Sequence, residues 1–228
     1  LESLASAEML LAPRDVVVVA STVVAKAEDR YFTLDDVEPS ERAIELAGIT
    51  HKDPRLVEVV LGESTAISRA APGVLVVRHR LGFVSANAGI DFSNVGRSGA
   101  TGLLLPIDPD RSARHLRGDL EAWGGVAPVA VVVSDTHGRA FRKGNVNVAI
   151  GVSGLPPIVD ERGQPDLFGR TLEATVVPLA DQVAVAAGLV TGEAAEGIPV
   201  VIVRGIDFEL SDAPATDLNW PPESDLFA

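Results

Sequence analysis

The segment 131–144, VVVSDTHGRAFRKG, constrains the fold of this chain more than any other. Its valines predict a buried β-strand, and Asp135 follows them closely. A buried strand carries a charge at its end only where that charge meets solvent, a metal or a ligand. The cations that come next are Arg139, Arg142 and Lys143. We therefore expect the strand to end at Asp135, at the edge of a site for a hard cation or an anionic substrate.

A simpler interpretation of the same segment is a strand that ends in an Asx-type turn. In that case Asp135 caps the turn through its carboxylate, and Gly138 supplies the bend. The local sequence fits a binding site and a turn equally well.

The composition is that of an ordinary globular protein. With 228 residues, 46% of them hydrophobic, the chain can bury a core large enough for one domain or two intertwined ones. No apolar run approaches the roughly 18 to 20 residues that cross a bilayer, and no signal-type segment is visible. We therefore expect a cytoplasmic protein without a membrane partner, built as one domain over residues 1–228 with no clear internal boundary.

Charge and cysteine content narrow the possible functions. The formal net charge of -13 disfavours a general nucleic-acid-binding surface. The absence of cysteine excludes disulfides, a thiolate nucleophile and a cysteine-type zinc site. Any metal is then bound by oxygen or imidazole, and oxygen ligands favour magnesium, manganese or calcium.

Strands and helices are expected to follow one another along the whole chain. Expected strands cover residues 15–24, 74–80, 103–106, 172–178 and 199–204, and residues 146–155 form an apolar segment punctuated by glycines. Expected helices cover residues 2–11, 39–47, 54–63, 108–123 and 180–189. This mixture predicts an α/β or α+β fold with a buried sheet.

Asp135 and Asp181 form the candidate pair for a metal site, because each lies at the boundary of an otherwise apolar element. Two carboxylates from different elements can hold one divalent ion, which keeps waters and binds phosphate oxygens. Gln182 adds a neutral amide oxygen. The alternative for Asp181 is an acid that stabilises a helix N-terminus without a further role.

Ser21, Thr22 and Lys26 end the first expected strand in a similar way. Two hydroxyls and an ammonium can bind phosphate oxygens. The chain contains neither a G-x-x-x-x-G-K-[ST] loop nor a G-x-G-x-x-G turn, so a standard P-loop or dinucleotide-binding fold is not supported.

Three other features have a functional and a structural interpretation. The small-residue loop 82–94 either brings its backbone close to a ligand, with Asn87 and Asn94 as candidate substrate contacts, or is a tight structural loop. Phe168 either covers a ring or, as is commoner for a loop phenylalanine, packs on the core. His137 lies beside the candidate site, and a histidine in a surface turn is the favoured interpretation.

In their order along the chain, these motifs resemble those of the coenzyme F420-0:L-glutamate ligase family. The resemblance covers residues 21–26, 52–55, 79–94, 104–113, 134–142, 166–170, 180–182, 200–205 and 221–227. No single motif is diagnostic, but so many in one order make a chance resemblance improbable.

The resemblance implies an enzyme that adds γ-linked glutamate to a deazaflavin coenzyme. GTP would phosphorylate a carboxylate of the precursor, coenzyme F420-0, and the amine of L-glutamate would then displace phosphate. Mg2+ or Mn2+ would neutralise the transferred phosphoryl group, and K+ is a further candidate cofactor. The expected architecture is the family's gamma-glutamyl-ligase-like fold, an intertwined homodimer.

The same resemblance assigns roles by position. Asp135 and Asp181 are expected to be catalytic metal ligands, with Gln182 at a neighbouring ligand position. Expected nucleotide contacts are Ser21, Thr22, Lys26 and Gly138. Glu223, in the acidic C-terminal segment, is expected to close on nucleotide and metal. Arg139 is a candidate contact for an anionic substrate.

The chain departs from the family pattern at three positions. The family usually reads Ser-Lys-x-x-Ser-Lys where this chain has Thr22 and Ala25, and Asp-Glu where it has Gln182. The chain also begins inside the first expected helix, without the family's N-terminal strand and Gly-Leu-Pro-like loop. A site with fewer charges should bind metal and triphosphate more weakly. The alternatives are therefore a weakened ligase, a non-catalytic relative that binds coenzyme or nucleotide, and a ligase for another carboxylic acid.

Overall fold

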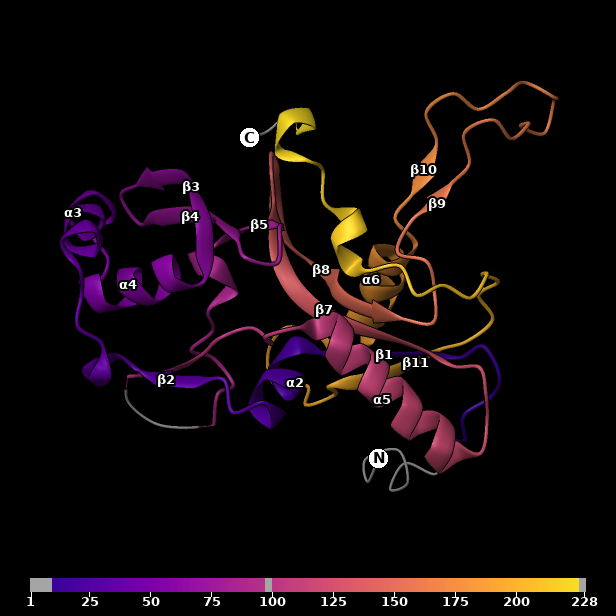
Figure 1. The fold of residues 1–228 in the computed structure, drawn as a ribbon, viewed down its shortest axis with the longest axis horizontal. Coiled ribbons are helices and arrows are strands. Elements are labelled where there is room, and N and C mark those ends of the chain that lie inside the picture. Colours follow the sequence, from indigo (N-terminus) through magenta and orange to yellow (C-terminus); the bar gives the residue numbers. More distant parts are fainter. Residues whose placement is uncertain (1–9, 97–99, 226–228) are drawn as a thin grey trace. The chain divides into compact units, whose positions relative to one another are not determined.

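The structure is a computed structural model that describes residues 10–96 and 100–225. The helix expected over residues 2–11 falls outside the described residues except for its last two, which are not helical. Strands and helices occur along the rest of the chain (Figure 1), so the expected α/β class is confirmed. None of the described helices combines the length and apolar character that a membrane span requires.

The chain divides into two compact units, each assembled from separate segments. Unit 1 comprises Leu1–Ala20, Asp108–Asp135 and Asn147–Leu218. Unit 2 comprises Ser21–Ile107, Thr136–Val146 and Asn219–Ala228. Two of the boundaries fall beside Ser21 and Asp135, the positions at which the sequence predicted functional strand ends.

A four-stranded sheet is the centre of unit 1. Its strands, in their order in the sheet, are β11 (Val200–Val203), β1 (Val16–Ala20), β7 (Ala130–Arg139) and β8 (Arg142–Ser153). Strand β1 pairs in parallel with β7 and antiparallel with β11. The valines of β1 and of the first half of β7 are buried on both faces of the sheet, which explains why they form unbroken runs instead of alternating with polar residues.

Two helices accompany this sheet. Helix α6 (Leu179–Thr191) packs Ala180, Val183 and Ala184 against sheet valines that include Val16 and Val132. Helix α5 (Pro109–Gly124) confirms the helix expected over residues 108–123, and its N-cap Asp108 accepts a hydrogen bond from Arg111 N. The other described elements of unit 1 are β9 (Val159–Asp160), β10 (Val176–Val177) and the 3-10 helix η3 (Ala215–Leu218).

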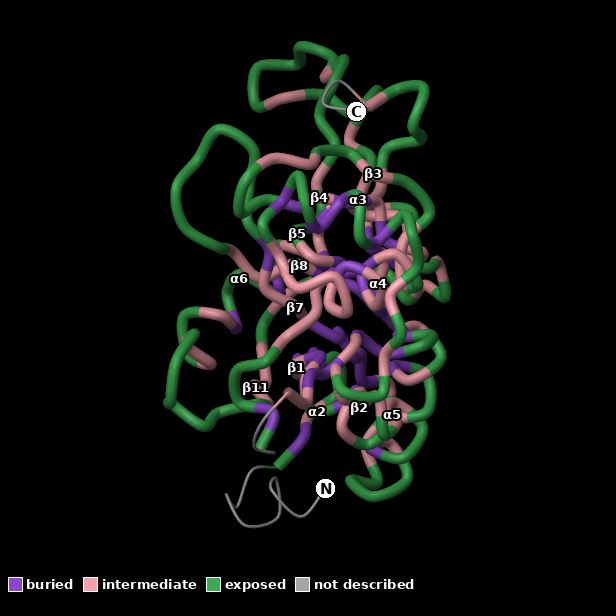
Figure 2. The backbone as a smooth tube through the Cα atoms, turned by 90° about the vertical axis from the view of Figure 1, so that its left-hand side faces the viewer, coloured by how far each residue is buried: buried purple, intermediate pink, exposed green. Residues whose placement is uncertain are grey.

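Unit 2 contains a three-stranded antiparallel sheet covered by two helices. The strands are β3 (Ser64–Ala71), β4 (Val74–His79) and β5 (Val84–Ala86), and the helices are α3 (Glu41–Thr50) and α4 (Pro54–Gly62). Leu46 of α3 and Val57 of α4 share a buried cluster with Leu75 and Val77 of β4. Figure 2 shows this burial along the backbone, with the loops largely exposed.

The smaller elements of unit 2 carry several candidate residues. They are α2 (Ser21–Ala27), β2 (Tyr31–Thr33) with its partner β6 (Thr101–Leu103), and the 3-10 helices η1 (Leu34–Asp36), η2 (Asn87–Gly89) and η4 (Pro222–Ser224).

The expected end of the first strand is wrong. The strand stops at Ala20, whose pairing partner in β7 is Ser134, and Ser21 begins helix α2. The buried residues of this helix are Ser21, Val24 and Ala25, which have helical spacing, but the adjacent Val23 makes the segment look like the continuation of a valine-rich strand. Ser21, Thr22 and Lys26 therefore lie on a short helix that follows a strand.

The expected strand end at Asp135 is wrong as well. Strand β7 continues to Arg139 and turns through Ala140 and Phe141 into β8. The parallel pairing with β1 stops at Ser134, so Asp135 is the first residue of β7 beyond it. Gly138 lies within the strand, so the interpretation of this segment as an Asx-type turn is also wrong. The strand continues because its other neighbour, β8, extends past the end of β1.

Other differences concern strands with weak apolar patterns. The strand expected at 172–178 is reduced to Val176–Val177, and the one expected at 103–106 lies at Thr101–Leu103. The loop 82–94 contains β5 and η2. Strand β3, with the sequence STAISRAA, was not expected, because most of its side chains are small and it buries little surface.

Candidate active site

Asp135 lies on β7 of unit 1 at the point where one neighbouring strand ends. Its side chain is half-buried, and the preceding residue, Ser134, is buried. The Ser134 hydroxyl has no hydrogen-bond partner among the described residues. A buried hydroxyl without a partner is costly, so this part of the strand is suited to a polar ligand.

Asp181 lies in the first turn of α6, as expected, and its side chain is also hydrogen-bonded to the sheet. Its Oδ1 atom accepts a hydrogen bond of 2.8 Å from Ala149 N on β8. Strand β8 is the direct neighbour of β7, the strand that carries Asp135. Gln182 follows on the same helix and is exposed. The structure therefore anchors Asp181 to the strand next to the one that carries Asp135.

The donor atoms of these three residues are of the chemical type that binds a hard divalent cation. Two carboxylates and an amide offer oxygen donors, which Mg2+ and Mn2+ prefer. Among the described residues, no three His, Cys, Asp or Glu side chains are grouped so that they could hold a metal ion. An ion at Asp135 and Asp181 would therefore need waters or phosphate oxygens to complete its coordination.

In unit 2 the structure joins a predicted nucleotide contact to a predicted substrate contact. Lys26 Nζ, at the end of α2, donates a hydrogen bond of 2.5 Å to the carbonyl oxygen of Asn94. Asn94 has a positive φ of 53°, a backbone conformation that asparagine tolerates better than most residues. The Lys26 ammonium thus lies at the end of the loop that contains Asn87 and Asn94.

The other residues of α2 differ in their exposure. Ser21 is buried, and Thr22 is half-buried. Ala25 is only 1% exposed and lies in an apolar cluster with Val95 and Leu103. A serine hydroxyl at position 25 would therefore enter a core, so the departure from the family pattern at Ala25 has a packing explanation.

Asn87 opens the 3-10 helix η2 with a φ of 50°, and its Oδ1 atom is buried without a hydrogen-bond partner among the described residues. Ala88 follows with a φ of 55° and is buried in the core of unit 2. Two consecutive left-handed residues give the loop a defined shape that few sequences adopt. The approach of this loop to a ligand stays a prediction.

The hairpin that joins β7 to β8 carries the predicted contacts Gly138 and Arg139. A Cβ atom on Gly138 would meet only the Asn145 side chain, at 4.0 Å, so the glycine leaves open space on the strand. Arg139 is exposed and donates a hydrogen bond of 3.1 Å to the carbonyl oxygen of Lys143. Phe141, in the turn, is 91% exposed.

Glu223 lies on η4 and is exposed. The segment around it contacts other parts of unit 2 at two points. Asn219 Nδ2 donates to the carbonyl oxygen of Leu81 at 3.2 Å, and Asp225 lies 3.7 Å from Arg78. The C-terminal segment that carries Glu223 is therefore held against the turn between β4 and β5.

Two structural interpretations made from the sequence are wrong. His137 is buried within β7 and not in a surface turn, and its ring lies 4.7 Å from that of Phe83. Phe168 is 94% exposed and does not pack on the core. It follows Leu167 in a turn organised by Asp166, whose Oδ1 accepts from Phe168 N and Arg170 N.

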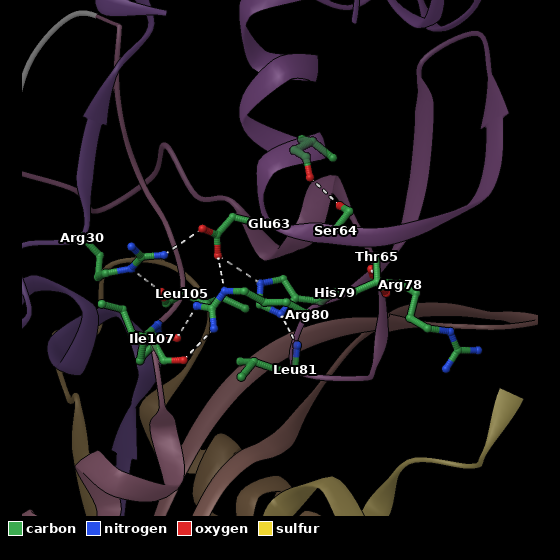
Figure 3. A network of polar contacts seen from close by, with 12 residues as sticks. Arg30, Glu63, Ser64, Thr65, Arg78, His79, Arg80, Leu81, Leu105 and Ile107 are labelled. Atoms are coloured by element: carbon green, nitrogen blue, oxygen red, sulfur yellow. Dashed lines mark hydrogen bonds and ion pairs between the residues drawn. The ribbon is translucent and has the colours of Figure 1, made fainter. Parts of the chain in front are cut away.

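Sequence reasoning missed a partly buried ionic network in unit 2 (Figure 3). Glu63, directly after α4, accepts hydrogen bonds of 2.9 Å from Arg30 Nη2 and from Arg80 Nε. His79 Nε2 lies 3.5 Å from Glu63 Oε2, a polar contact too long for a full hydrogen bond. No spacing in the sequence connects these residues, because they come from three separate segments, after α2, after α4 and at the end of β4.

The network changes the acidity of Glu63. Burial alone would raise the pKa of this carboxyl, but the His79 imidazole and the Arg80 and Arg30 guanidiniums together lower the pKa to about 2. Glu63 is therefore ionised at neutral pH and is the shared acceptor for two arginines.

The structure thus defines a mixed α/β protein with Asp135 and Asp181 on neighbouring elements of one unit and a lysine-bearing helix in the other. The chain belongs to the F420-0:gamma-glutamyl ligase family, whose family model matches residues 1–205. The resemblance inferred from the motifs is confirmed.

Curated relatives agree with this assignment. The chain is 48% identical over 215 residues to the coenzyme F420:L-glutamate ligase of Methanothermobacter thermautotrophicus, a match that covers 93% of this chain and 84% of that protein. It is 49% identical over 217 residues to the enzyme of the same name from Methanopyrus kandleri, covering 93% and 85%. A third relative of that name, from Methanocaldococcus jannaschii, is 43% identical over 213 residues, covering 93% and 84%.

Proposed function

We propose that this protein is a GTP- and divalent-metal-dependent ligase that joins the amine of L-glutamate to a carboxylate of coenzyme F420-0 in an amide bond, within the series of additions that builds the γ-linked glutamates of the coenzyme. The observation that carries the proposal is the identity of 48% over 93% of the chain to a protein named coenzyme F420:L-glutamate ligase. In the first step, a carboxylate oxygen of F420-0 attacks the γ-phosphorus of GTP, and GDP leaves. In the second, the glutamate nitrogen attacks the acyl phosphate, inorganic phosphate leaves, and the amine loses a proton.

Asp135, Asp181 and Gln182 are proposed to hold Mg2+ or Mn2+. When bound, the ion would neutralise charge on the phosphoryl group that is transferred. The hydrogen bond from Ala149 N to Asp181 supports this role, because it fixes the carboxylate beside the strand that neighbours Asp135.

The nucleotide phosphates are proposed to contact Ser21, Thr22 and Lys26, with Gly138 and Glu223 as further contacts. Lys26 supplies the positive charge, and its bond to Asn94 orients the ammonium before the ligand arrives. Open space above Gly138 supports close approach of a ligand to the backbone of β7.

The acidic substrate is proposed to contact Arg139, Asn87 and Asn94. The exposed guanidinium of Arg139 can pair with a carboxylate or phosphate, and the Asn87 amide oxygen has no partner among the described residues. K+ as a further cofactor and assembly as a homodimer are proposed from the same family resemblance.

Mass spectrometry tests this function directly. F420-0 incubated with GTP, L-glutamate, Mn2+ and the protein should gain the mass of one or more glutamyl residues, and GDP should accumulate. Asp135→Asn should lower kcat by roughly 100-fold or more, because it removes a charge that stabilises the transferred phosphoryl group. The matched control is Asp119→Asn, an exposed acid on α5. Absence of product with the wild-type protein, or equal activity of the two variants, would contradict the proposal.

A second candidate, a relative that binds nucleotide without turnover, is favoured by the neutral and exposed side chain of Gln182. A double variant that combines Gln182→Glu with Thr22→Lys distinguishes this candidate from the active ligase. If the double variant forms product and the wild type binds nucleotide but forms none, the protein is the non-catalytic relative.

A further inference from the structure

We propose that Glu63 is a positioning residue that holds α2 and the loop 82–94 in the arrangement that brings Lys26 to Asn94. This inference rests on the proposed function, in which Lys26 binds nucleotide phosphate. Glu63 contacts neither of these residues itself. It acts through Arg30 and Arg80, within unit 2 alone.

The first step concerns the segment that follows β6. Arg30 Nε donates to the carbonyl oxygen of Leu105 at 2.9 Å, and Arg80 donates to those of Pro106 and Ile107 at 2.9 and 2.6 Å. Both arginines also donate to Glu63 (Figure 3). One carboxylate, 14% exposed, therefore orients two guanidiniums toward three consecutive carbonyl groups.

The second step connects this segment to α2. Arg30 N donates to the carbonyl oxygen of Ala25 at 3.0 Å, and Leu104 N donates to that of Arg30 at 3.0 Å. Ile107 N donates to Glu28 Oε2 at 2.9 Å. The end of α2, where Lys26 lies, is thus bonded to the same stretch of chain that Arg30 and Arg80 hold.

The third step connects the network to the loop 82–94. Leu103 and Asp91 exchange two backbone hydrogen bonds, of 2.9 and 3.1 Å. At the start of the loop, the Phe83 ring stacks on His79 with the ring centroids 5.0 Å apart. His79 Nδ1 accepts from Leu81 N at 3.0 Å, so the imidazole is held by this hydrogen bond and by the stacked ring of Phe83. Helix α2, which carries Lys26, and the loop 82–94, which carries Asn94, therefore both depend on the orientation in which Glu63 holds Arg30 and Arg80.

The test compares Glu63→Gln with Glu121→Gln. Glu121 is the matched control, because it is a partly buried glutamate paired with an arginine, Arg117, in unit 1. Binding of the β,γ-imido analogue of GTP with Mn2+ is measured by calorimetry on the full chain. Glu63→Gln should bind roughly fivefold to tenfold more weakly, while Glu121→Gln should stay within about twofold of wild type. The KM for GTP should rise with little change in kcat.

Arg80→Lys is the second variant if Glu63→Gln does not fold. It keeps the positive charge but cannot reach Glu63 and two carbonyl groups together, so it should weaken nucleotide binding in the same direction. Equal losses of binding in the Glu63 and Glu121 variants, or a change in kcat alone, would overturn the positioning role.

Hydrogen exchange without nucleotide separates this inference from the proposed function. Backbone amides of 21–27 and 87–94 should exchange faster in Glu63→Gln than in Glu121→Gln. If the wild type does not bind the analogue, the proposed function fails, and the exchange rates still decide whether Glu63 orders the two segments. Unchanged exchange in both segments would overturn the inference.

Discussion

At the scale of single residues, the partners of a buried carboxylate decide its acidity. Glu63 is paired with two guanidiniums, and its pKa falls to about 2. Asp110, on α5, accepts hydrogen bonds from Val152 N and Ala215 N, yet burial outweighs these bonds and raises the pKa of its carboxyl. Full opposite charges at close range offset desolvation, whereas backbone dipoles do so only in part.

The lowered pKa of Glu63 predicts a dependence of stability on pH. Because the folded-state value of about 2 lies below the ordinary value of 4.5, the ionised carboxylate stabilises the fold above about pH 5. This contribution, at most about 3 kcal/mol, is lost as the pH falls from about 4.5 toward 2. Urea unfolding across this range should therefore show a shallower pH dependence for Glu63→Gln than for the wild type. Parallel curves for the two proteins would contradict the assignment.

At the scale of elements, hydrogen-bond partners decide where strands end. The valines of β1 and β7 were recognised from the sequence, but β1 ends earlier than expected and β7 later. Strand β7 continues beyond Asp135 because β8 remains its neighbour in the sheet. Strand β1 stops at Ala20, whose pairing partner in β7 is Ser134. By contrast, the helices α4 and α5 were well predicted, since each begins with a local cap, Asp53 or Asp108.

The contact between β8 and α5 predicts a large difference between two glycine substitutions. In Gly151→Ala, the new Cβ would lie 2.4 Å from the backbone of Pro109, which cannot move without shifting the start of α5. We expect a loss of unfolding free energy of about 1 to 3 kcal/mol or more. In Gly118→Ala, nothing lies within 4 Å, and helix propensity should add about 0.5 to 1 kcal/mol. Chemical denaturation of both variants measures this, and similar losses in both would show that the contact is not tight.

At the scale of the whole molecule, the chain is shared between two units that are not contiguous segments. It passes from one unit to the other after Ala20, Ile107, Asp135, Val146 and Leu218. Neither unit can therefore be completed by a single stretch of sequence. We expect ligand binding in either unit to stabilise the whole chain against thermal unfolding.

Thermal unfolding with nucleotide and metal checks this expectation. With Mn2+ and the GTP analogue at about 100 times Kd, the Tm of the wild type should rise by roughly 5 to 10 °C. Asp135→Asn should lose most of the rise, and Gln182→Glu should enlarge it by restoring a negative charge beside Asp181. The Asp119→Asn control should behave as wild type. A rise of equal size without Mn2+ would argue against metal-dependent binding.

Interactions between residues that are close in sequence made part of this structure predictable. The valine runs predicted the buried sheet, and helical spacing, with an aspartate and proline at the start of α5, predicted the helices α3 to α6, because these patterns act within one or a few turns of chain. The order of motifs predicted the family. The candidate site residues were chosen in the same way, and their roles stay predictions until nucleotide, metal and substrate binding are measured.

Only the tertiary structure decided which residues share an environment. Lys26 and Asn94 are far apart in sequence, as are Asp181 and Ala149, and nothing in their spacing indicates a bond. The arginine pair at Glu63 and the burial of Ala25 also depend on long-range packing. The sequence by itself determined the family, the valine-rich cores of β1 and β7 and the helices α3 to α6, since these follow from local pattern. The contacts that orient candidate site residues were decided by strand pairing and loop packing between distant segments.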